Sequence, residues 1–125
     1  MANPVILIIE DDPLLTKMYR TKFEMEGYDV IVAEDGQIGI DELTKQVPDF
    51  IVLDLMMPRV SGIEVLERLK VSPVFKDIPV MVLTNMTRDE ERQRAVELGA
   101  VEFVLKADFT PTQVVEKIKG YLSVN

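Results

Sequence analysis

The chain has 125 residues, of which 47% are hydrophobic, and this length is typical of a single domain built around one core. It contains neither Cys nor His, which excludes disulfide bonds, thiolate or imidazole metal ligands, and Ser-His-Asp catalysis. A net charge of −8 without a basic cluster argues against direct nucleic-acid binding, and no apolar run is long enough to span a membrane. We therefore expect one cytoplasmic domain over residues 1–125.

Strand and helix patterns alternate from one end of the chain to the other. Asp12-Pro13 and Thr110-Pro111 each place a capping side chain before a Pro at the first helical position, and Gly27 is a typical helix-ending residue. In chain order, the patterns predict strand 5–9, helix 13–26, strand 29–33, helix 37–46, strand 50–54, helix 61–72, strand 78–84, helix 88–98, strand 101–105 and helix 111–122. Few residues follow the last helix, so we expect no output domain after it.

This alternation predicts an α/β fold in which helices cover both faces of a parallel sheet. The strands at 5–9, 50–54 and 78–84 are largely apolar, as expected for strands buried on both faces. Asp29 and Glu102 make the other two strands more polar, which is typical of sheet edges. The predicted fold class is a flavodoxin-like (βα)5 three-layer sandwich, with a parallel five-stranded sheet of order 2-1-3-4-5.

Polar side chains follow four of the predicted strands, at the sheet edge where open parallel sheets bind ligands. They are Glu10-Asp11-Asp12, Asp54, Thr84 and Lys106. Two like charges ~4 Å apart repel by about 4 kcal/mol at an effective dielectric constant near 20, so the acidic side chains need a cation or a proton between them. Oxygen ligands without His or Cys favour Mg²⁺. The pattern therefore indicates a cation-dependent phosphoryl site.

Each acidic residue of this group also has a simpler interpretation. Asp12 is best explained as the cap of the following helix, whereas Glu10 and Asp11 exceed what capping needs and are interpreted as metal ligands. Asp54 is either a strand-end carboxylate satisfied by backbone N–H groups or a nucleophile that forms an aspartyl-phosphate. The neighbouring acids and the lysine favour the nucleophile.

The lysine and the threonine are judged in the same way. Lys106 follows a largely apolar strand, where a lysine is unfavourable unless it is paired, so we expect it to pair with Asp54 rather than to lie exposed in a loop. The hydroxyl of Thr84 is suited to contact a phosphoryl oxygen. Thr84 is equally well explained as a β-branched strand residue, and the residue alone leaves both interpretations open.

Taken together, these residues resemble the receiver domain of bacterial two-component response regulators, and in particular its stand-alone, chemotaxis-regulator-like members. The resemblance covers the whole chain and rests on the order and spacing of Glu10-Asp11, Asp54, Met57-Pro58, Gly62, Thr84 and Lys106. It also supports the strand order given above. The implied function is that of a phosphorylatable signalling switch of a two-component system, not of an enzyme beyond phosphoryl transfer to, and autodephosphorylation of, its own aspartate.

The resemblance implies a role for each residue. Asp54 accepts a phosphoryl group from a histidine on a sensor histidine kinase or a histidine phosphotransfer protein. Asp11 binds Mg²⁺ directly, Glu10 acts through water, and Asp54 and the backbone carbonyl of Met56 complete the protein ligands. Thr84 and Lys106 hold the phosphoryl oxygens. Phe103 occupies the aromatic switch position and turns inward as Thr84 moves, so that the fourth helix, fifth strand and fifth helix present a changed face to a downstream protein.

The sequence departs from the family pattern at several positions. Ala107 follows Lys106 where the family commonly carries a Pro with a cis peptide bond, and a cis bond before another residue costs ~3 kcal/mol. Asn85 replaces a smaller residue. Phe103 lacks the hydroxyl of a Tyr, so any switch rests on packing. Met56 and Met86 occupy the positions that flank the path of the hydrolytic water in the family, and both are apolar. We therefore expect a long-lived phosphoryl group.

Two other functions remain as alternatives. A metal-dependent phosphatase of related architecture also uses a strand-end Asp nucleophile, but it usually carries a second Asp two residues later, where this chain has Met56. A flavodoxin-like cofactor binder needs a glycine or hydroxyl loop that holds phosphate after the first strand. The acidic Glu10-Asp11-Asp12 segment at that point would repel a phosphate group.

Overall fold

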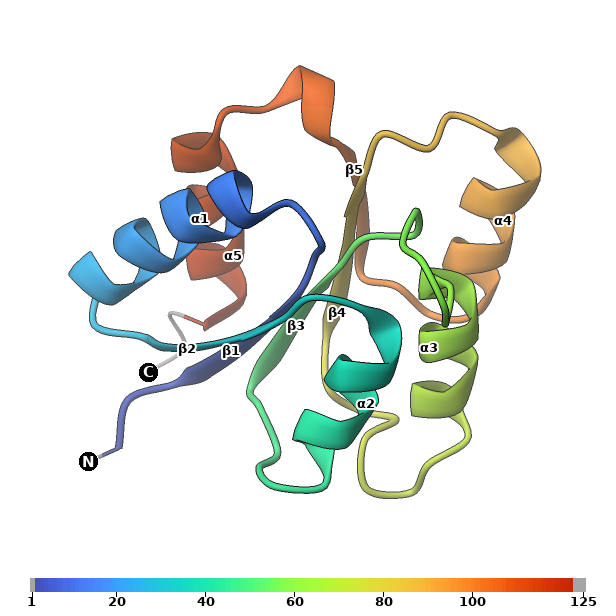
Figure 1. The fold of residues 1–125 in the computed structure, drawn as a ribbon, viewed down its shortest axis with the longest axis horizontal. Helices are drawn as coiled ribbons and strands as arrows, with labels where there is room; N and C mark the ends of the chain where they lie inside the picture. The colour runs from blue at the N-terminus through green and yellow to red at the C-terminus, as the bar shows by residue number, and fades with distance from the viewer. Residues whose placement is uncertain (1, 123–125) are drawn as a thin grey trace.

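The computed structural model describes residues 2–122 and shows a parallel sheet covered by helices on both faces (Figure 1). Strands and helices alternate along the chain, as the sequence predicts. In order, the elements are β1 (Val5–Ile9), α1 (Pro13–Met25), β2 (Asp29–Ala33), α2 (Gly36–Leu43), β3 (Phe50–Leu53), α3 (Gly62–Lys70), β4 (Val80–Thr84), α4 (Asp89–Glu97), β5 (Glu102–Leu105), the 3₁₀ helix η1 (Lys106–Asp108) and α5 (Pro111–Leu122).

The five strands pair in parallel in the order β2-β1-β3-β4-β5, which confirms the predicted arrangement (Figure 1). Every residue of β1, β3 and β4 is buried. The edge strands β2 and β5 are only partly buried, in agreement with the polar Asp29 and Glu102 at their starts. Apolar sequence along three strands thus identified the centre of the sheet correctly.

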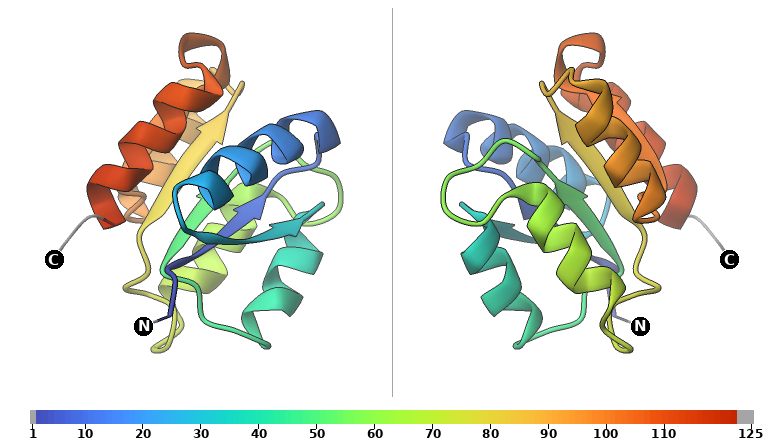
Figure 2. Two further views of the ribbon diagram at one scale, coloured as in Figure 1. Left: turned by 90° about the vertical axis from the view of Figure 1, so that its left-hand side faces the viewer. Right: turned by 90° about the vertical axis from the view of Figure 1, so that its right-hand side faces the viewer.

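The helices divide into two layers. Helices α1 and α5 cover one face of the sheet, and α2, α3 and α4 cover the other (Figure 2). Successive side chains of a strand point to opposite faces of the sheet, so each central strand contributes to both cores. In β1, Ile6 and Ile8 pack with side chains of α1 and α5, while Leu7 and Ile9 pack on the opposite face. The result is two apolar cores separated by one sheet, the predicted three-layer sandwich.

Polar caps define where several helices begin. The Asp12 carboxylate accepts hydrogen bonds from the backbone N–H groups of Leu14 and Leu15, so Asp12 is the N-cap of α1 as predicted. Asp35 caps α2 in the same way by accepting from the N–H of Ile38. Gly27 adopts a φ of 92° just after α1, a conformation that favours glycine. The Asp12 cap and the Gly27 stop were predicted from the sequence, whereas the Asp35 cap was not.

Seven of the ten predicted elements differ from the observed ones by one to three residues at one or both ends, and one further element was not predicted. The second helix ends at Leu43 instead of residue 46, and the Thr44 hydroxyl bonds the Asp41 carbonyl at 2.7 Å in its last turn. The third strand ends at Leu53, because Asp54 already turns to accept the N–H of Met56. The chain after β5 forms the 3₁₀ helix η1, which was not predicted. The residues after Leu122, on which the expectation of no output domain depended, lie outside the described part of the chain.

None of the helices within residues 2–122 combines the length and the apolar composition that a membrane-spanning helix requires. The five α-helices are short, and each of them buries at least one side chain.

The first residue of α3 lies directly against the end of β3. A Cβ atom on Gly62 would lie 2.3 Å from the carbonyl oxygen of Asp54 and 2.5 Å from the Cα atom of Leu55, both of which are backbone atoms. The N–H of Gly62 also donates to the Leu55 carbonyl at 3.3 Å. Only glycine allows this close approach, so Gly62 fixes the backbone that carries Asp54.

We predict that Gly62→Ala lowers the free energy of unfolding by about 2 kcal/mol, because backbone atoms must move to admit the methyl group. Gly120→Ala is the matched control, since a Cβ atom on Gly120 meets nothing within 4 Å. In the interior of α5 this second change should stabilise the protein by about 0.5–1 kcal/mol. Urea unfolding of both variants measures the difference, and equal stabilities would contradict this account of Gly62.

Candidate functional site

Strand register brings the predicted site residues to one edge of the sheet. Ile9 in β1 pairs with Leu53 in β3, so Glu10 and Asp54 leave neighbouring strands side by side, and the N–H of Asp54 donates to the Ile9 carbonyl at 3.0 Å. On the other side, Thr84 pairs with Leu105, the residue before Lys106. The carboxyl ends of four strands therefore deliver their polar groups to the same region.

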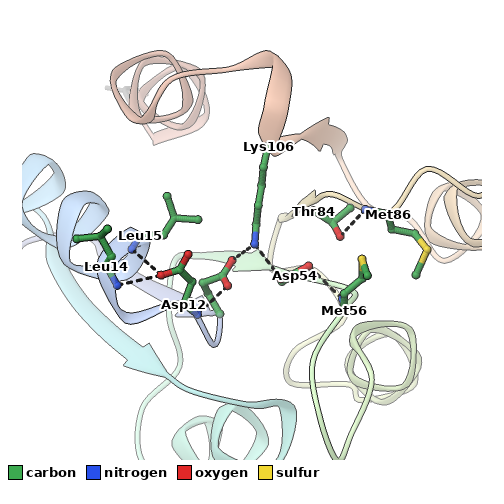
Figure 3. A network of polar contacts seen from close by, with 9 residues as sticks. Asp12, Leu14, Leu15, Asp54, Met56, Thr84, Met86 and Lys106 are labelled. Atoms are coloured by element: carbon green, nitrogen blue, oxygen red, sulfur yellow. Dashed lines mark hydrogen bonds and ion pairs between the residues drawn. The ribbon is translucent and has the colours of Figure 1, made fainter.

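Lys106 lies between two buried carboxylates (Figure 3). Its Nζ donates to Asp54 Oδ2 at 2.9 Å and forms an ion pair with Glu10 Oε1 at 2.5 Å. Glu10 and Asp54 are each only 3% exposed. The predicted pairing of Lys106 with Asp54 is present, and the contact with Glu10 is an additional one. One ammonium group thus offsets part of the charge of two carboxylates.

Burial affects the protonation of both ends of this network. Burial raises the pKa of Glu10, and the neighbouring Asp54 charge adds to the rise, while the hydrogen bonds from Lys106 and Asp12 act in the opposite direction. For Lys106, burial lowers the pKa, but the hydrogen bonds to Glu10 and Asp54 outweigh it, so the pKa is raised overall. The lysine is therefore firmly charged at neutral pH and holds the site together.

In three of the loops at this edge, a backbone N–H group donates to the polar side chain two residues earlier in the chain (Figure 3). The N–H of Asp12 donates to Glu10 Oε2 at 3.0 Å, and the N–H of Met56 donates to Asp54 Oδ1 at 3.0 Å. The N–H of Met86 donates to Thr84 Oγ1 at 3.1 Å. Each bond spans two residues and orients an oxygen at the end of a strand. The positions of these oxygens are therefore set by backbone as well as by the lysine.

The acidic side chains are grouped closely enough to hold a metal ion. Glu10, Asp11 and Asp54 each offer a carboxylate oxygen, and these oxygens all lie within 4.8 Å of one another. Asp11 is exposed, whereas the other two are buried, so the group opens to solvent on one side. A set of oxygen ligands without nitrogen or sulfur suits a hard divalent cation. The acidic cluster could therefore bind such an ion.

Thr84 and Phe103 lie near the network without joining it. Thr84 is fully buried, and within residues 2–122 its hydroxyl forms no hydrogen bond to Asp54 or Lys106. Phe103 is half-buried and packs against the core beneath α2, α3 and α4. The structure thus places both residues at the predicted locations, while their predicted roles in a switch are not tested by this arrangement.

Helix α4 is attached to the domain mainly by polar contacts. Ala95 is its one buried residue. The guanidinium carbon of Arg92 lies 5.3 Å from the centroid of the Phe103 ring, which is within cation–π distance, and Arg94 pairs with Glu67 of α3 at 2.9 Å. Both arginines are exposed. Their partners, on β5 and α3, could not be identified from the pattern of α4 itself.

The departures from the family pattern have clear local consequences. Residues 2–122 contain no cis peptide bond, so the bond between Lys106 and Ala107 is trans. Met56 is 52% exposed at the rim of the site, and Met86 is half-buried and packs against the core. Both methionines flank the network in Figure 3, with their sulfur atoms clear of the charged groups. The rim of the site is thus lined by apolar side chains at these two positions.

Sequence reasoning did not single out one pair of residues near the site. Arg59, in the loop between β3 and α3, donates from Nε and Nη2 to Asp35 Oδ2 at 3.0 and 2.7 Å. Asp35 is also the N-cap of α2. Its position before Gly36 is a recognisable capping signal, but nothing in the sequence connects it to an arginine 24 residues away.

The fold and the site together define a class of protein: a doubly wound α/β domain whose sheet edge presents a lysine-paired acidic cluster. Comparison with known proteins is consistent with this class. Residues 6–119 match the sequence profile of the family described as the response regulator receiver domain. The phosphate regulon transcriptional regulatory protein PhoB of Escherichia coli (strain K12) is 35% identical over 117 residues, which cover 94% of this chain and 51% of PhoB.

Solved structures show the same likeness. The chemotaxis protein CheY4 of Vibrio cholerae aligns with a TM-score of 0.86 at 25% identity, over 95% of this chain and 98% of that one. The Mn²⁺-bound form of response regulator Rcp1 aligns with a TM-score of 0.84 at 26% identity, over 95% of this chain and 94% of that one. The metal in the second structure is consistent with the acidic cluster described above.

The chain belongs to the response regulator receiver family. It is therefore a signalling module of two-component systems rather than an enzyme, and its acidic cluster of Glu10, Asp11 and Asp54 fits the phosphoacceptor site of such a domain. Receiver domains pair with histidine kinases. The chain spans about half the length of the curated relatives it matches. The family assignment confirms the resemblance seen in the sequence.

We predict that Lys106→Met lowers the free energy of unfolding at pH 7 by about 3 kcal/mol, because it leaves two buried carboxylates without their shared cation. Lys119→Met is the matched control. Lys119 also contacts two carboxylates, Glu26 and Glu116, but on the surface, so its loss should be much smaller. Thermal and urea unfolding measure both variants. Equal losses would show that the buried network does not depend on Lys106.

Proposed function

We propose that this protein is a phosphorylatable signalling switch in which Asp54 accepts a phosphoryl group from a phosphohistidine. The donor is a sensor histidine kinase or a histidine phosphotransfer protein. One observation carries the proposal: Asp54 is a buried carboxylate at a strand end, bonded to Lys106 through Oδ2 and grouped with Glu10 and Asp11. In a carboxylate with a purely structural role, two further acids nearby would only add electrostatic repulsion.

The chemistry requires a carboxylate oxygen of Asp54 to attack the phosphorus atom of the phosphohistidine. A P–O bond forms as the P–N bond breaks, and the imidazole leaves with the bonding electron pair. The Lys106 ammonium, already in place beside Asp54, offsets the negative charge on the incoming phosphoryl oxygens. The Thr84 hydroxyl, at the end of the neighbouring strand, holds another of these oxygens once its bond with the Met86 N–H is exchanged.

A divalent cation completes this site in the proposed function. Mg²⁺ would be held by Asp11 and Asp54 directly, by Glu10 through water, and by the backbone carbonyl of Met56. Bound there, it would neutralise charge that develops on the phosphoryl group. The all-oxygen donor set and its closeness, with carboxylate oxygens within 4.8 Å of one another, support this assignment. The exposure of Asp11 leaves a path for the ion and its remaining waters.

The output of the switch is proposed to run through Phe103. When Thr84 moves toward the phosphoryl group, it vacates space that the half-buried Phe103 ring takes up, and the face formed by α4, β5 and α5 changes. A downstream protein then recognises this face. The weak attachment of α4, with only Ala95 buried, supports a role for this helix in the change. Phosphorylation thus acts by biasing a two-state element.

Incubation with acetyl phosphate and Mg²⁺ tests the acceptor. We expect the wild-type protein to gain one phosphoryl group, detected by intact mass, and Asp54→Asn to gain none. Asp12→Asn is the matched control, because Asn caps a helix as well as Asp and the residue lies beside the same site, so this variant should still be phosphorylated. Modification of the Asp54 variant at the same level, or catalytic turnover of the donor without an adduct, would contradict the proposal.

The apolar rim predicts a long-lived phosphoryl group. Met56 and Met86 offer no polar group to orient the water that hydrolyses the acyl phosphate, so polar replacements should speed the loss. We expect the phosphorylated Met56→Asn and Met86→Glu variants to lose their phosphoryl group faster than the wild-type protein does. The rate is measured as release of inorganic phosphate after the donor has been removed. Met25→Asn, an 80% exposed methionine near the end of α1, should not change the rate. Equal or slower loss in the two rim variants contradicts the prediction.

A further inference from the structure

The loop between β3 and α3, residues 54–61, is anchored at both of its ends. At its start, Met56 donates its N–H to Asp54 Oδ1. At its end, Gly62 packs against the backbone of Asp54 and Leu55. Between these anchors lies the carbonyl of Met56, which the proposed function assigns to the metal. The position of that carbonyl therefore depends on what holds the middle of the loop.

The middle of the loop is held by the start of α2. Two N–H groups of Arg59 donate to a single oxygen of Asp35, at 3.0 and 2.7 Å, while the other oxygen of Asp35 caps α2 through the N–H of Ile38 at 2.9 Å. In addition, a Cβ atom on Gly36 would lie 2.5 Å from the Val60 carbonyl oxygen. The loop backbone thus rests on the helix terminus, and the arginine ties it there.

Arg59 adopts an uncommon backbone conformation at this contact, and its side chain is 58% exposed. Among residues 2–122, Arg59 is the one non-glycine residue with a positive φ, 66°. An L-residue adopts this region only when the surrounding structure favours it strongly enough. The Asp35 side chain is only 13% exposed, and its pKa is lowered by the N–H of Ile38 and by the Arg59 guanidinium, so it stays charged at neutral pH. Within residues 2–122, the polar contacts of the Arg59 side chain are all with this charged carboxylate.

We propose that Asp35 and Arg59 are positioning residues for the phosphoacceptor site: their ion pair fixes the β3–α3 loop so that the Met56 carbonyl is held ready for the metal ion. This inference rests on the proposed function, because it assumes that a divalent ion binds beside Asp54. Neither residue is itself a ligand. Their effect is transmitted through the loop backbone from Arg59 to Met56.

The charges of the two residues allow a sharp test. If they influenced a bound cation only through long-range electrostatics, removing the negative Asp35 would weaken cation binding and removing the positive Arg59 would strengthen it. If they act by positioning the loop, both changes weaken binding. The double variant then binds about as weakly as the weaker single variant, because the same contact is lost in each case.

The experiment titrates Mn²⁺ into the full chain at fixed ionic strength and follows free Mn²⁺ by electron paramagnetic resonance. Asp35→Asn keeps the cap of α2, since Asn accepts the same hydrogen bond, and Arg59→Gln removes the charge from the loop. We expect each variant, and the double variant, to bind Mn²⁺ about fivefold more weakly than the wild-type protein, in the range of a well-ordered ion pair. Arg68→Gln, which breaks a surface pair with Glu64 on α3, should leave the affinity unchanged.

Two results would overturn the inference: tighter binding by Arg59→Gln together with weaker binding by Asp35→Asn, or unchanged affinity in both. Thermal unfolding without metal checks that all the variants are folded. The Mn²⁺ affinities of the wild-type protein and of Asp54→Asn show whether a failure concerns this inference or the proposed function. If the wild-type protein fails to bind Mn²⁺, or binds it independently of Asp54, the metal site itself is wrong and the inference falls with it. If the wild-type protein binds Mn²⁺ through Asp54 but the Asp35 and Arg59 variants bind it equally well, only the inference about the loop is wrong, and the proposed function still stands.

Discussion

The structure of the site depends on one partly buried ammonium group. Glu10 and Asp54 leave adjacent strands because β1 and β3 pair in register, so their carboxylates are brought together by the backbone whether or not that is favourable. Lys106, arriving from the end of β5, meets both of them. A cation supplied by the chain makes it possible to keep two acids out of water before any metal or phosphoryl group is present.

This arrangement also explains why the site can accept further charge. The single ammonium cannot neutralise three carboxylates, and Asp11 stays exposed next to the other two. The acidic cluster could therefore still bind a divalent cation, which under the proposed function would make a transferred phosphoryl group tolerable. Backbone N–H groups that return to Glu10, Asp54 and Thr84 keep the acceptor oxygens oriented throughout. The polar groups of the site are thus positioned by contacts within the chain itself.

How much of this was readable from the sequence depends on how far apart the interacting residues lie. Apolar strands, the Asp12 cap and the strand order followed from local patterns, because burial and capping leave signatures over a few residues. The gathering of Glu10, Asp54 and Lys106 followed once parallel strands were assumed. The contact of Arg59 with Asp35, that of Arg92 with Phe103 and the 3₁₀ helix after β5 did not follow, since each depends on how separate elements pack. The functional roles of Thr84 and Phe103 remain predictions.

The way in which α4 is held has a consequence for the whole domain. Each of the other four α-helices buries three or four residues, whereas α4 buries Ala95 and otherwise makes contacts through arginines that meet a ring and a carboxylate. Attraction between exposed charges is screened by dissolved ions, while apolar burial is not. Added salt should therefore loosen this one helix before it affects the rest, so that the ionic composition of the surroundings sets how firmly α4 is held against its neighbours.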